Sequence, residues 1–303
     1  MQLYGGIDLG GTKTQISVLD SRGGCVYNQR QYTPKTYQEI LLMIESLVHK
    51  AETTLGSSCT IGVGIPGSPS PITGLIRNAN TQCLNGMAFQ NDLERTLQRP
   101  IRLANDANCL AVSEATDGHG KGYDVVFAVI LGTGCGGGIS FNAQPWVGKM
   151  GIAGEWGHNQ LGWLQDNERE RPRCWCGQPH CHELFLSGPG LSQSYFLDHG
   201  MNKTAIEIFQ TYDHDEKSKR TISNYIDQLA RGLAQTINIL DPNIIILGGG
   251  LSNQTLLYEA LPQKIKKYIF SDVVDVKIMP AKFGDASGVR GAAWLWADAQ
   301  ATT

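Results

Sequence analysis

Three apolar runs that each end in a glycine-rich turn restrict the fold of this chain more than any other feature. The runs are Leu3–Leu9, Val125–Leu131 and Asn243–Leu247, and the turns that follow them occupy residues 10–11, 132–138 and 248–250. Because glycine has no Cβ, such a turn can adopt a positive φ and bring backbone N–H groups close to an anion such as phosphate. The first two strand–turn–strand units each carry a threonine, Thr12 and Thr133, and lie about 120 residues apart, which indicates two structurally similar halves.

The spacing of apolar residues predicts the elements around these turns. The expected strands are Leu3–Leu9, Thr14–Leu19, Cys25–Tyr32, Cys59–Ile65, Ile101–Ala104, Val125–Leu131, Ile139–Phe141 and Asn243–Leu247. Apolar residues three or four apart predict helices over residues 36–55, 222–240 and 287–297. Ser68–Arg99 is expected to be irregular and Asp166–Arg173 to be an exposed loop. A chain of 303 residues is expected to form about two domains.

These elements predict an α/β protein with two lobes. We expect a smaller N-terminal lobe at residues 1–117 and a larger C-terminal lobe at residues 118–303. The Asp-Gly-His-Gly segment near residues 115–122 is the expected hinge, and the C-terminal helix can pack back on the first lobe. Closure of the lobes would exclude water from a site between them.

The composition narrows the class of protein. Apolar residues make up 41% and charged residues 17%, with a formal net charge of −3, which is typical of a folded globular protein. No basic stripe indicates a nucleic-acid partner, and no run of about 18 apolar residues indicates a membrane span. The first ten residues lack the pattern of a signal peptide, so we expect a cytoplasmic protein with no membrane or nucleic-acid partner.

The second glycine turn has an alternative interpretation. Gly132, Gly134 and Gly137 match G-x-G-x-x-G, and Glu155 follows at about the distance found in dinucleotide-binding folds. That fingerprint requires a helix to begin at the glycines, whereas Ile139–Phe141 has the pattern of a strand. A nicotinamide-dependent oxidoreductase is therefore the alternative from another class. A P-loop signature is absent from the sequence.

The pair Asn105-Asp106 follows an apolar strand and precedes a helix. Asn and Asp are favoured helix N-caps, so a purely structural role is one interpretation of the pair. An enzyme that removes the proton of a hydroxyl group also needs a rigidly held base, and an Asp at the junction of a strand and a helix suits that task. Both interpretations remain open from the local sequence.

A cysteine cluster predicts a metal site. Cys174, Cys176 and Cys181 have the spacing C-x-C-x₄-C, and zinc prefers four tetrahedral nitrogen or sulfur ligands. His158 is the expected fourth ligand, because His180 and His182 are crowded against Cys181. Four protein ligands leave no open coordination position, so the zinc would be structural. The alternative is a group of buried reduced thiols.

Asp8–Thr12 resembles the first phosphate motif of the actin/hexokinase/Hsp70 superfamily, Leu131–Gly134 its second, and Ile246–Gly250 its adenosine motif. The resemblance implies a two-lobed actin/hexokinase-like (ribonuclease H-like) fold that binds ATP with Mg²⁺, Asp8 holding the magnesium through water. Lys13 could reach a phosphate or remain a solvated surface lysine. The implied cofactor-binding residues are Asp8, Gly10, Gly11, Thr12, Lys13, Gly132, Thr133, Gly134, Gly136, Gly248, Gly249 and Gly250.

Two motifs in this order resemble the ROK family of repressors, uncharacterised reading frames and sugar kinases. They are Gly154-Glu-Trp-Gly-His158 and Cys174-Trp-Cys-Gly-Gln-Pro-His-Cys-His-Glu183. By matching position, Asp106 is the catalytic base, and His158 has one ring nitrogen on zinc and the other on the sugar. The implied sugar-binding residues are Gly67, Asn80, Asn105, Asp106, Glu155, His158 and Glu183. His180 stands where the family has a glycine, so we expect a turn that is built differently.

Within that family, Gly64–Pro71 and Asn78-Ala79-Asn80 look most like bacterial fructokinases of the mannofructokinase type. The expected activity is therefore ATP-dependent phosphorylation of D-fructose, with glucose, mannose or an N-acetylhexosamine as the alternative substrate. A homodimer is a family expectation. Only seven residues precede Asp8, which argues against the DNA-binding segment that a ROK repressor would carry there.

Overall fold

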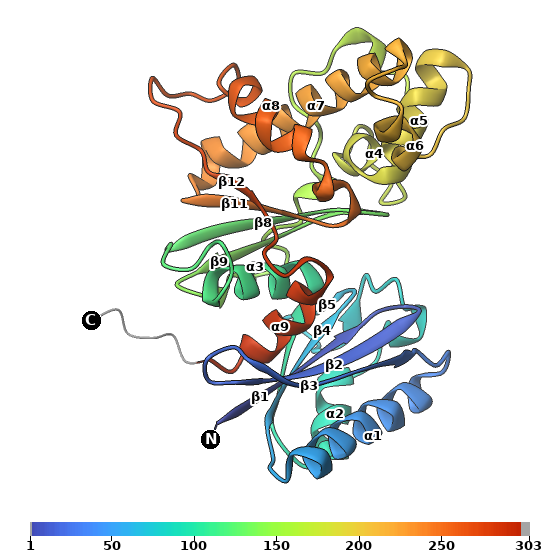
Figure 1. The fold of residues 1–303 in the computed structure, drawn as a ribbon. Coiled ribbons are helices and arrows are strands. Elements are labelled where there is room, and N and C mark those ends of the chain that lie inside the picture. The colour runs from blue at the N-terminus through green and yellow to red at the C-terminus, as the bar shows by residue number, and fades with distance from the viewer. Residues whose placement is uncertain (1, 298–303) are drawn as a thin grey trace. The chain divides into compact units, whose positions relative to one another are not determined.

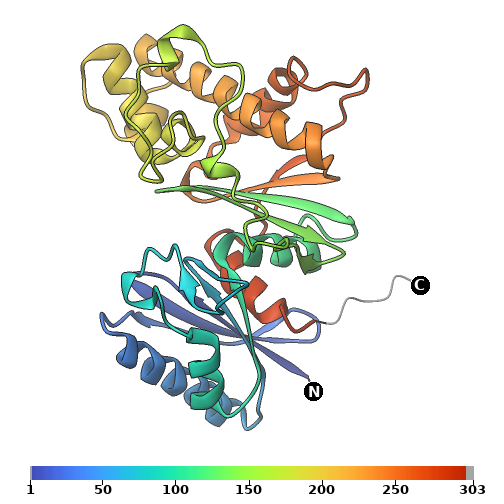
Figure 2. The ribbon, with the colours of Figure 1, turned by 180° about the vertical axis from the view of Figure 1, so that it is seen from behind.

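The structure is a computed structural model that describes residues 2–297, and it contains two five-stranded sheets with helices packed on them (Figures 1 and 2). The strands are β1 Leu3–Leu9, β2 Lys13–Asp20, β3 Cys25–Tyr32, β4 Thr60–Ile65, β5 Ser68–Pro69, β6 Ile76–Arg77, β7 Ile101–Asn105, β8 Val125–Leu131, β9 Cys135–Phe141, β10 Gln144–Pro145, β11 Ile244–Gly248 and β12 Ile278–Pro280. The α-helices are α1 Tyr37–Leu55, α2 Phe89–Leu97, α3 Asp106–Thr116, α4 Glu183–Leu186, α5 Gly188–His199, α6 Ala205–Gln210, α7 Glu216–Leu240, α8 Thr255–Ile265 and α9 Ser287–Trp294.

The chain forms two compact units. The first consists of the chain up to Val126, Gly138–Ala153, and the chain from Lys282 onward. The second consists of Phe127–Gly137 and Gly154–Ala281. The first unit thus extends beyond residue 117 and includes α9, and the chain passes between the units four times.

The sheet of the first unit has the order β3-β2-β1-β4-β7. β1 pairs with β2 in antiparallel register, whereas β1, β4 and β7 are parallel. Asp8 pairs with Gly64, and Ile65 pairs with Asn105. The carboxyl ends of these three parallel strands therefore share one edge of the sheet, which is where ligands bind in open α/β sheets.

Helices cover both faces of this sheet. α1 and α2 lie on one face, and α3 and α9 lie on the other (Figure 1). The backbone of α9 packs directly on the strands, since a Cβ at Gly6 would lie 2.0 Å from Val289 O and one at Gly62 would lie 1.9 Å from Ala292 O. The Thr36 side chain caps the start of α1, and Gly56 in the left-handed conformation ends it.

In the second unit, α7 is the longest helix and packs against α8, α5 and α4 (Figure 2). The Arg231 guanidinium on α7 is buried and donates to the buried carboxylate of Glu168 at 2.8 Å. This pair fixes the segment that precedes the cysteine cluster. The second sheet has the order β10-β9-β8-β11-β12.

Most predicted elements are present, with some differences. The segment Ser68–Arg99, expected to be irregular, contains the hairpin β5–β6 and the helix α2. β9 begins at Cys135, inside the turn expected at residues 132–138, so the last of those glycines lie in a strand where the dinucleotide fingerprint requires a helix. α8 and β12 were not predicted individually, and α9 ends at Trp294 rather than at residue 297. Among the described residues, no helix is long and apolar enough to span a bilayer.

Candidate active site and metal centre

The turn between β1 and β2 holds the first set of expected phosphate-binding residues. The Gly10 N–H donates to Lys13 O at 3.1 Å, and the Thr33 hydroxyl donates to Gly10 O at 2.7 Å. A Cβ at residue 10 would lie 2.7 Å from Lys13 O, so a side chain would force this turn to change. Burial raises the pKa of Asp8, just before the turn, and the nearby Arg30 partly offsets the shift. A cation bound near this carboxylate would offset the cost of its burial.

Asn105 and Asp106 occupy the carboxyl end of β7. Asn105 is the N-cap of α3, and its Oδ1 accepts the Ala107 N–H at 2.9 Å. Asp106 is the first helical residue, and its Oδ1 accepts the same N–H at 2.8 Å. The capping interpretation is therefore correct for Asn105, and the Asp106 carboxylate is held at a defined position beside the cap.

A buried thiol lies close to both carboxylates of this unit. Cys109 is one turn after Asp106 on α3 and is fully buried. Burial, together with the negative charges of Asp8 and Asp106, raises its pKa well above the usual value. Asp8 and Asp106 therefore lie within electrostatic range of one sulfur atom, at the edge of the sheet shared by β1 and β7.

The hairpin β5–β6 positions the other predicted sugar-binding residues of the first unit. The Asn80 N–H donates to Pro66 O at 3.1 Å, which brings Asn80 next to the end of β4. A Cβ at Gly67 would lie 2.8 Å from Arg77 O, so this close return of the chain requires glycine. Five predicted site residues therefore lie at or next to adjoining strand ends: Asp8, Gly67, Asn80, Asn105 and Asp106.

In the second unit, the two remaining glycine turns adjoin each other. The Gly132 N–H donates to Gly134 O at 3.0 Å, and the Gly188 N–H at the start of α5 donates to Gly132 O at 2.8 Å. Gly249 has a φ of 81°, and a Cβ there would lie 2.5 Å from Leu131 O. The turn after β11 therefore packs against the end of β8, so the expected phosphate and adenosine turns are neighbours.

The segment Glu155–His158 packs on β9. The Trp156 indole donates to Gly136 O at 2.8 Å and its ring meets Phe127 edge to face. A Cβ at Gly157 would lie 1.8 Å from Cys135 O, so no other residue fits here without a backbone shift. This packing places His158 at the end of a short 3₁₀ turn, Trp156–His158.

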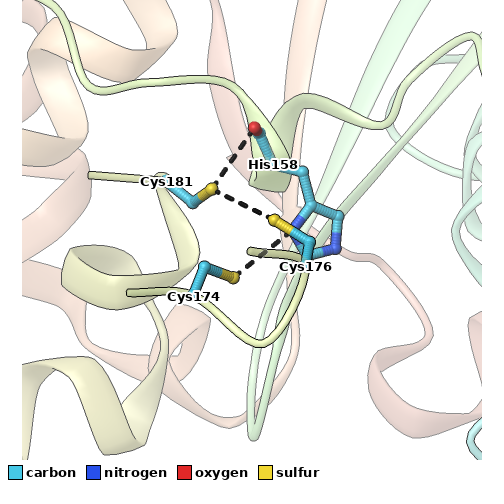
Figure 3. A group of neighbouring side chains, drawn as sticks. All are labelled: His158, Cys174, Cys176 and Cys181. Carbon is cyan, nitrogen blue, oxygen red and sulfur yellow. Dashed lines mark hydrogen bonds between the residues drawn. The ribbon is translucent and has the colours of Figure 1, made fainter. Parts of the chain in front are cut away.

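The four predicted metal ligands lie together. His158, Cys174, Cys176 and Cys181 each offer one ligand atom, and these atoms are all within 4.8 Å of one another (Figure 3). Cys174 Sγ is 3.7 Å from His158 Nδ1, and Cys176 Sγ is 3.6 Å from Cys181 Sγ. In Figure 3 the three sulfur atoms and the imidazole converge on one point.

These distances fit a zinc ion. Zn–S and Zn–N bonds of about 2.3 and 2.0 Å in a tetrahedron separate neighbouring ligand atoms by about 3.5–3.8 Å, as the two measured pairs do. Burial and the neighbouring thiols raise the pKa of Cys181 to about 12, and burial also raises the pKa of Cys174. A divalent cation reverses such shifts by stabilising the thiolates. The residues present therefore fit a structural zinc.

The turn before Cys181 explains how histidine replaces a glycine. His180 has a φ of 57°, in the left-handed region that favours glycine. For a residue with a Cβ this conformation costs roughly 1–2 kcal/mol. The His180 ring lies within hydrogen-bond distance of Arg169 O, with Nε2 at 3.0 Å, and this contact offsets part of the cost. The replacement of glycine by histidine therefore leaves a left-handed residue in the turn directly before Cys181.

Glu183 and Trp175 form a contact that the sequence did not predict. Glu183 begins α4, and its Oε2 accepts the Cys135 N–H of β9 at 3.1 Å. Its Oε1 accepts the Trp175 indole N–H at 2.7 Å. Trp175 lies between two metal ligands, and that position was the only signal in the sequence that could have singled it out.

The comparisons with known proteins identify one family over nearly the whole chain. The ROK family profile matches residues 4–299. The chain is 38% identical over 299 residues to an N-acetyl-D-glucosamine kinase of Pectobacterium carotovorum subsp. carotovorum (strain PC1), covering 97% of this chain and 98% of the relative. It is 39% identical over 301 residues to an N-acetyl-D-glucosamine kinase of Histophilus somni (strain 129Pt), covering 97% and 99%.

Among solved structures, a ROK hexokinase from Thermus thermophilus superposes with a TM-score of 0.86 at 27% identity and covers 97% of both chains. This confirms the expected actin/hexokinase-like α/β fold. Both relatives above are named for N-acetyl-D-glucosamine, so the expected likeness to fructokinases is not what the comparisons favour. The profile match over nearly the whole length shows that this chain belongs to the ROK family.

Proposed function

We propose that this protein is an ATP-dependent kinase that phosphorylates N-acetyl-D-glucosamine. The observation that carries the kinase proposal is the shared strand edge of the first unit, where Asp106 directly follows β7 and the turn after Asp8 follows the parallel strand β1. A base and a phosphate-binding turn on one rigid sheet edge are what transfer of a phosphoryl group to a hydroxyl requires. The sugar is supported by the names of the two relatives, and fructose remains the second candidate from the sequence motifs.

In the proposed mechanism, Asp106 accepts the proton of the sugar hydroxyl as that oxygen attacks the γ-phosphorus of ATP. The Ala107 N–H and the adjacent Asn105 cap hold the carboxylate in place. A positioned base of this kind contributes about 10²–10⁴-fold to the rate. Gly67, Asn80, Asn105, Glu155, His158 and Glu183 are the proposed sugar-binding residues.

The glycine turns would hold the nucleotide. Backbone N–H groups of Gly10–Lys13 and of Gly132–Gly136 are proposed to bind the phosphates, and Gly248–Gly250 to contact the adenosine. Lys13 Nζ lies 5.9 Å from the centre of the Tyr32 ring, so its approach to a phosphate would require it to leave that ring. Magnesium bound with ATP neutralises phosphate charge during the transfer. Zinc bound at His158 and the three cysteines would fix the orientation of the sugar-binding imidazole. It would take no part in the transfer of the phosphoryl group.

An ADP-release assay with N-acetylglucosamine, N-acetylmannosamine, glucose, mannose and fructose tests the proposal. We expect the highest kcat/KM for N-acetylglucosamine. A preference for fructose would restore the specificity that the sequence motifs indicate. Absence of ADP release with every sugar would refute the kinase proposal itself.

A further inference from the structure

An exposed tryptophan contacts two of the proposed sugar-binding residues. Trp175 has 69% of its surface exposed, so burial does not hold its ring in place. Two specific contacts do. Its indole N–H donates to Glu183 Oε1 at 2.7 Å, and its ring meets the His158 imidazole edge to face with centroids 4.9 Å apart.

The Glu183 carboxylate is held at both oxygens. The Trp175 indole occupies Oε1, and the Cys135 N–H donates to Oε2 at 3.1 Å. Oε2 also lies only 2.9 Å from where a Cβ on Gly134 would be, so the carboxylate rests on the second glycine turn. Among the described residues, the Trp175 indole N–H is the one hydrogen-bond donor that the structure shows for Glu183 Oε1. Removing the indole would therefore remove the direct protein hydrogen bond to this oxygen.

From this geometry we infer that Trp175 is a positioning residue for sugar binding. This inference rests on the proposed function. Its N–H sets the rotamer of Glu183, and its ring limits the orientation of His158. Indole is a donor only, so the contact also leaves the remaining lone pairs of Glu183 Oε1 open to a sugar hydroxyl. The residue acts through Glu183 and is not itself a catalytic residue.

Trp175→Phe tests the inference because it keeps an aromatic ring and removes the N–H donor. We expect the KM for N-acetylglucosamine to rise about three- to tenfold, the size expected for loss of one ordinary hydrogen bond, because the exposed Trp175 makes this contact at the protein surface. The KM for ATP should stay within about twofold, since the Cys135 contact remains. Zinc content and melting temperature should match the wild type. Trp146→Phe is the matched control, because Trp146 is also exposed, at 53%, and its side chain meets the Phe141 ring edge to face, a contact that a phenylalanine can keep.

A double-mutant cycle shows whether Trp175 acts through Glu183. Calorimetric titration with N-acetylglucosamine would compare wild type, Trp175→Phe, Glu183→Ala and the double variant. If the inference holds, Trp175→Phe weakens binding in the wild-type background and has no further effect in the Glu183→Ala background. Equal effects in both backgrounds, or a matching rise in the KM for ATP, would overturn it.

The same titration separates this inference from the proposed function. A wild-type protein that binds the sugar without releasing ADP would refute the kinase proposal, while the cycle would still decide the role of Trp175. A wild-type protein that binds none of the five sugars would overturn both. Loss of zinc or a lower melting temperature in Trp175→Phe would instead assign the residue a purely structural role and overturn the inference.

Discussion

At the scale of single residues, the site depends on side chains whose neighbours leave them few alternatives. Asp106 keeps its position because a helix N-terminus and a cap adjoin it. Residue 157 must be glycine because Cys135 O occupies the space that a Cβ would need. His180 has a left-handed backbone, and its ring lies within hydrogen-bond distance of Arg169 O. Each constraint comes from a contact with a specific neighbouring atom.

Replacing Asp106 by Asn should lower kcat at least about 100-fold while leaving the fold and sugar affinity nearly unchanged. The Asn side-chain oxygen can still accept the Ala107 N–H that Asp106 Oδ1 accepts at 2.8 Å, but it cannot take up a proton. Steady-state kinetics and a melting curve on one preparation provide the measurement. A variant that retains more than about a tenth of the wild-type kcat would contradict the role of Asp106.

Glu114 provides a test that depends on pH. It is fully buried on α3 and accepts the Lys282 N–H and the His119 N–H at 3.0 Å each. Burial raises its pKa in the folded protein above the usual value of 4.5, despite these hydrogen bonds. A raised pKa contributes stability below the unfolded pKa, and that contribution is lost as the pH rises through the folded pKa.

We therefore expect the difference in melting temperature, wild type minus Glu114→Gln, to decrease as the pH rises from about 4.5 to 8. The reason is that residue 114 can lose a proton in the wild type but not in the variant. Calorimetric melts at several pH values would measure it. A difference that stays constant or grows with pH would show that hydrogen bonds to the ionised carboxylate outweigh its burial.

At the scale of elements, α9 depends on glycines in the strands beneath it. Gly62→Ala would place a Cβ 1.9 Å from Ala292 O, which is backbone and cannot move alone. We expect a loss of about 3 kcal/mol in the free energy of unfolding, at the upper end of overpacking effects. Gly74→Ala is the control, since nothing lies within 4 Å of its Cβ and its φ of 70° should cost an alanine only about 1–2 kcal/mol. Denaturant titration would test this, and equal losses in the two variants would contradict the packing argument.

The loop that carries Cys174, Cys176 and Cys181 is predicted to depend on a bound zinc ion. We expect about one zinc per chain by elemental analysis and its loss in the double variant Cys174→Ser/Cys176→Ser, because two of four ligands are removed. Cys25→Ser is the control, since Cys25 is exposed and lies outside the cluster. A metal content unaffected by the double substitution would show that the metal binds elsewhere.

At the scale of the whole molecule, the two compact units can be tested separately. All four metal ligands belong to the second unit, Phe127–Gly137 with Gly154–Ala281. Chelation of the zinc should therefore increase amide hydrogen exchange mainly in that unit, near Trp156–His158 and residues 174–186. The strands β1–β4 of the first unit should keep their protection. An equal loss of protection in β1–β4 would show that the units do not unfold independently.

Much of this protein follows from its sequence alone, because the relevant signals are local. Glycine turns after apolar strands, an Asn-Asp pair before a helix, and closely spaced cysteines each depend on a few neighbouring residues. Together with the spacing of apolar residues, these signals predicted the strands β1, β2 and β3, the helices α1 and α7, and the convergence of His158 with the three cysteines. The motifs that indicated fructose did not agree with the relatives, because specificity depends on a few contacts rather than on a pattern.

Contacts between residues distant in sequence required the tertiary structure. The placement of Asp8 and Asp106 near Cys109 results from the parallel register of β1, β4 and β7, and the sequence does not state a register. The packing of α9 on β1 and β4 joins segments more than 200 residues apart, through glycines whose partners only the folded chain reveals. The hydrogen bond from Trp175 to Glu183 depends on the turn at His180, because that turn directs the chain from the metal loop into α4.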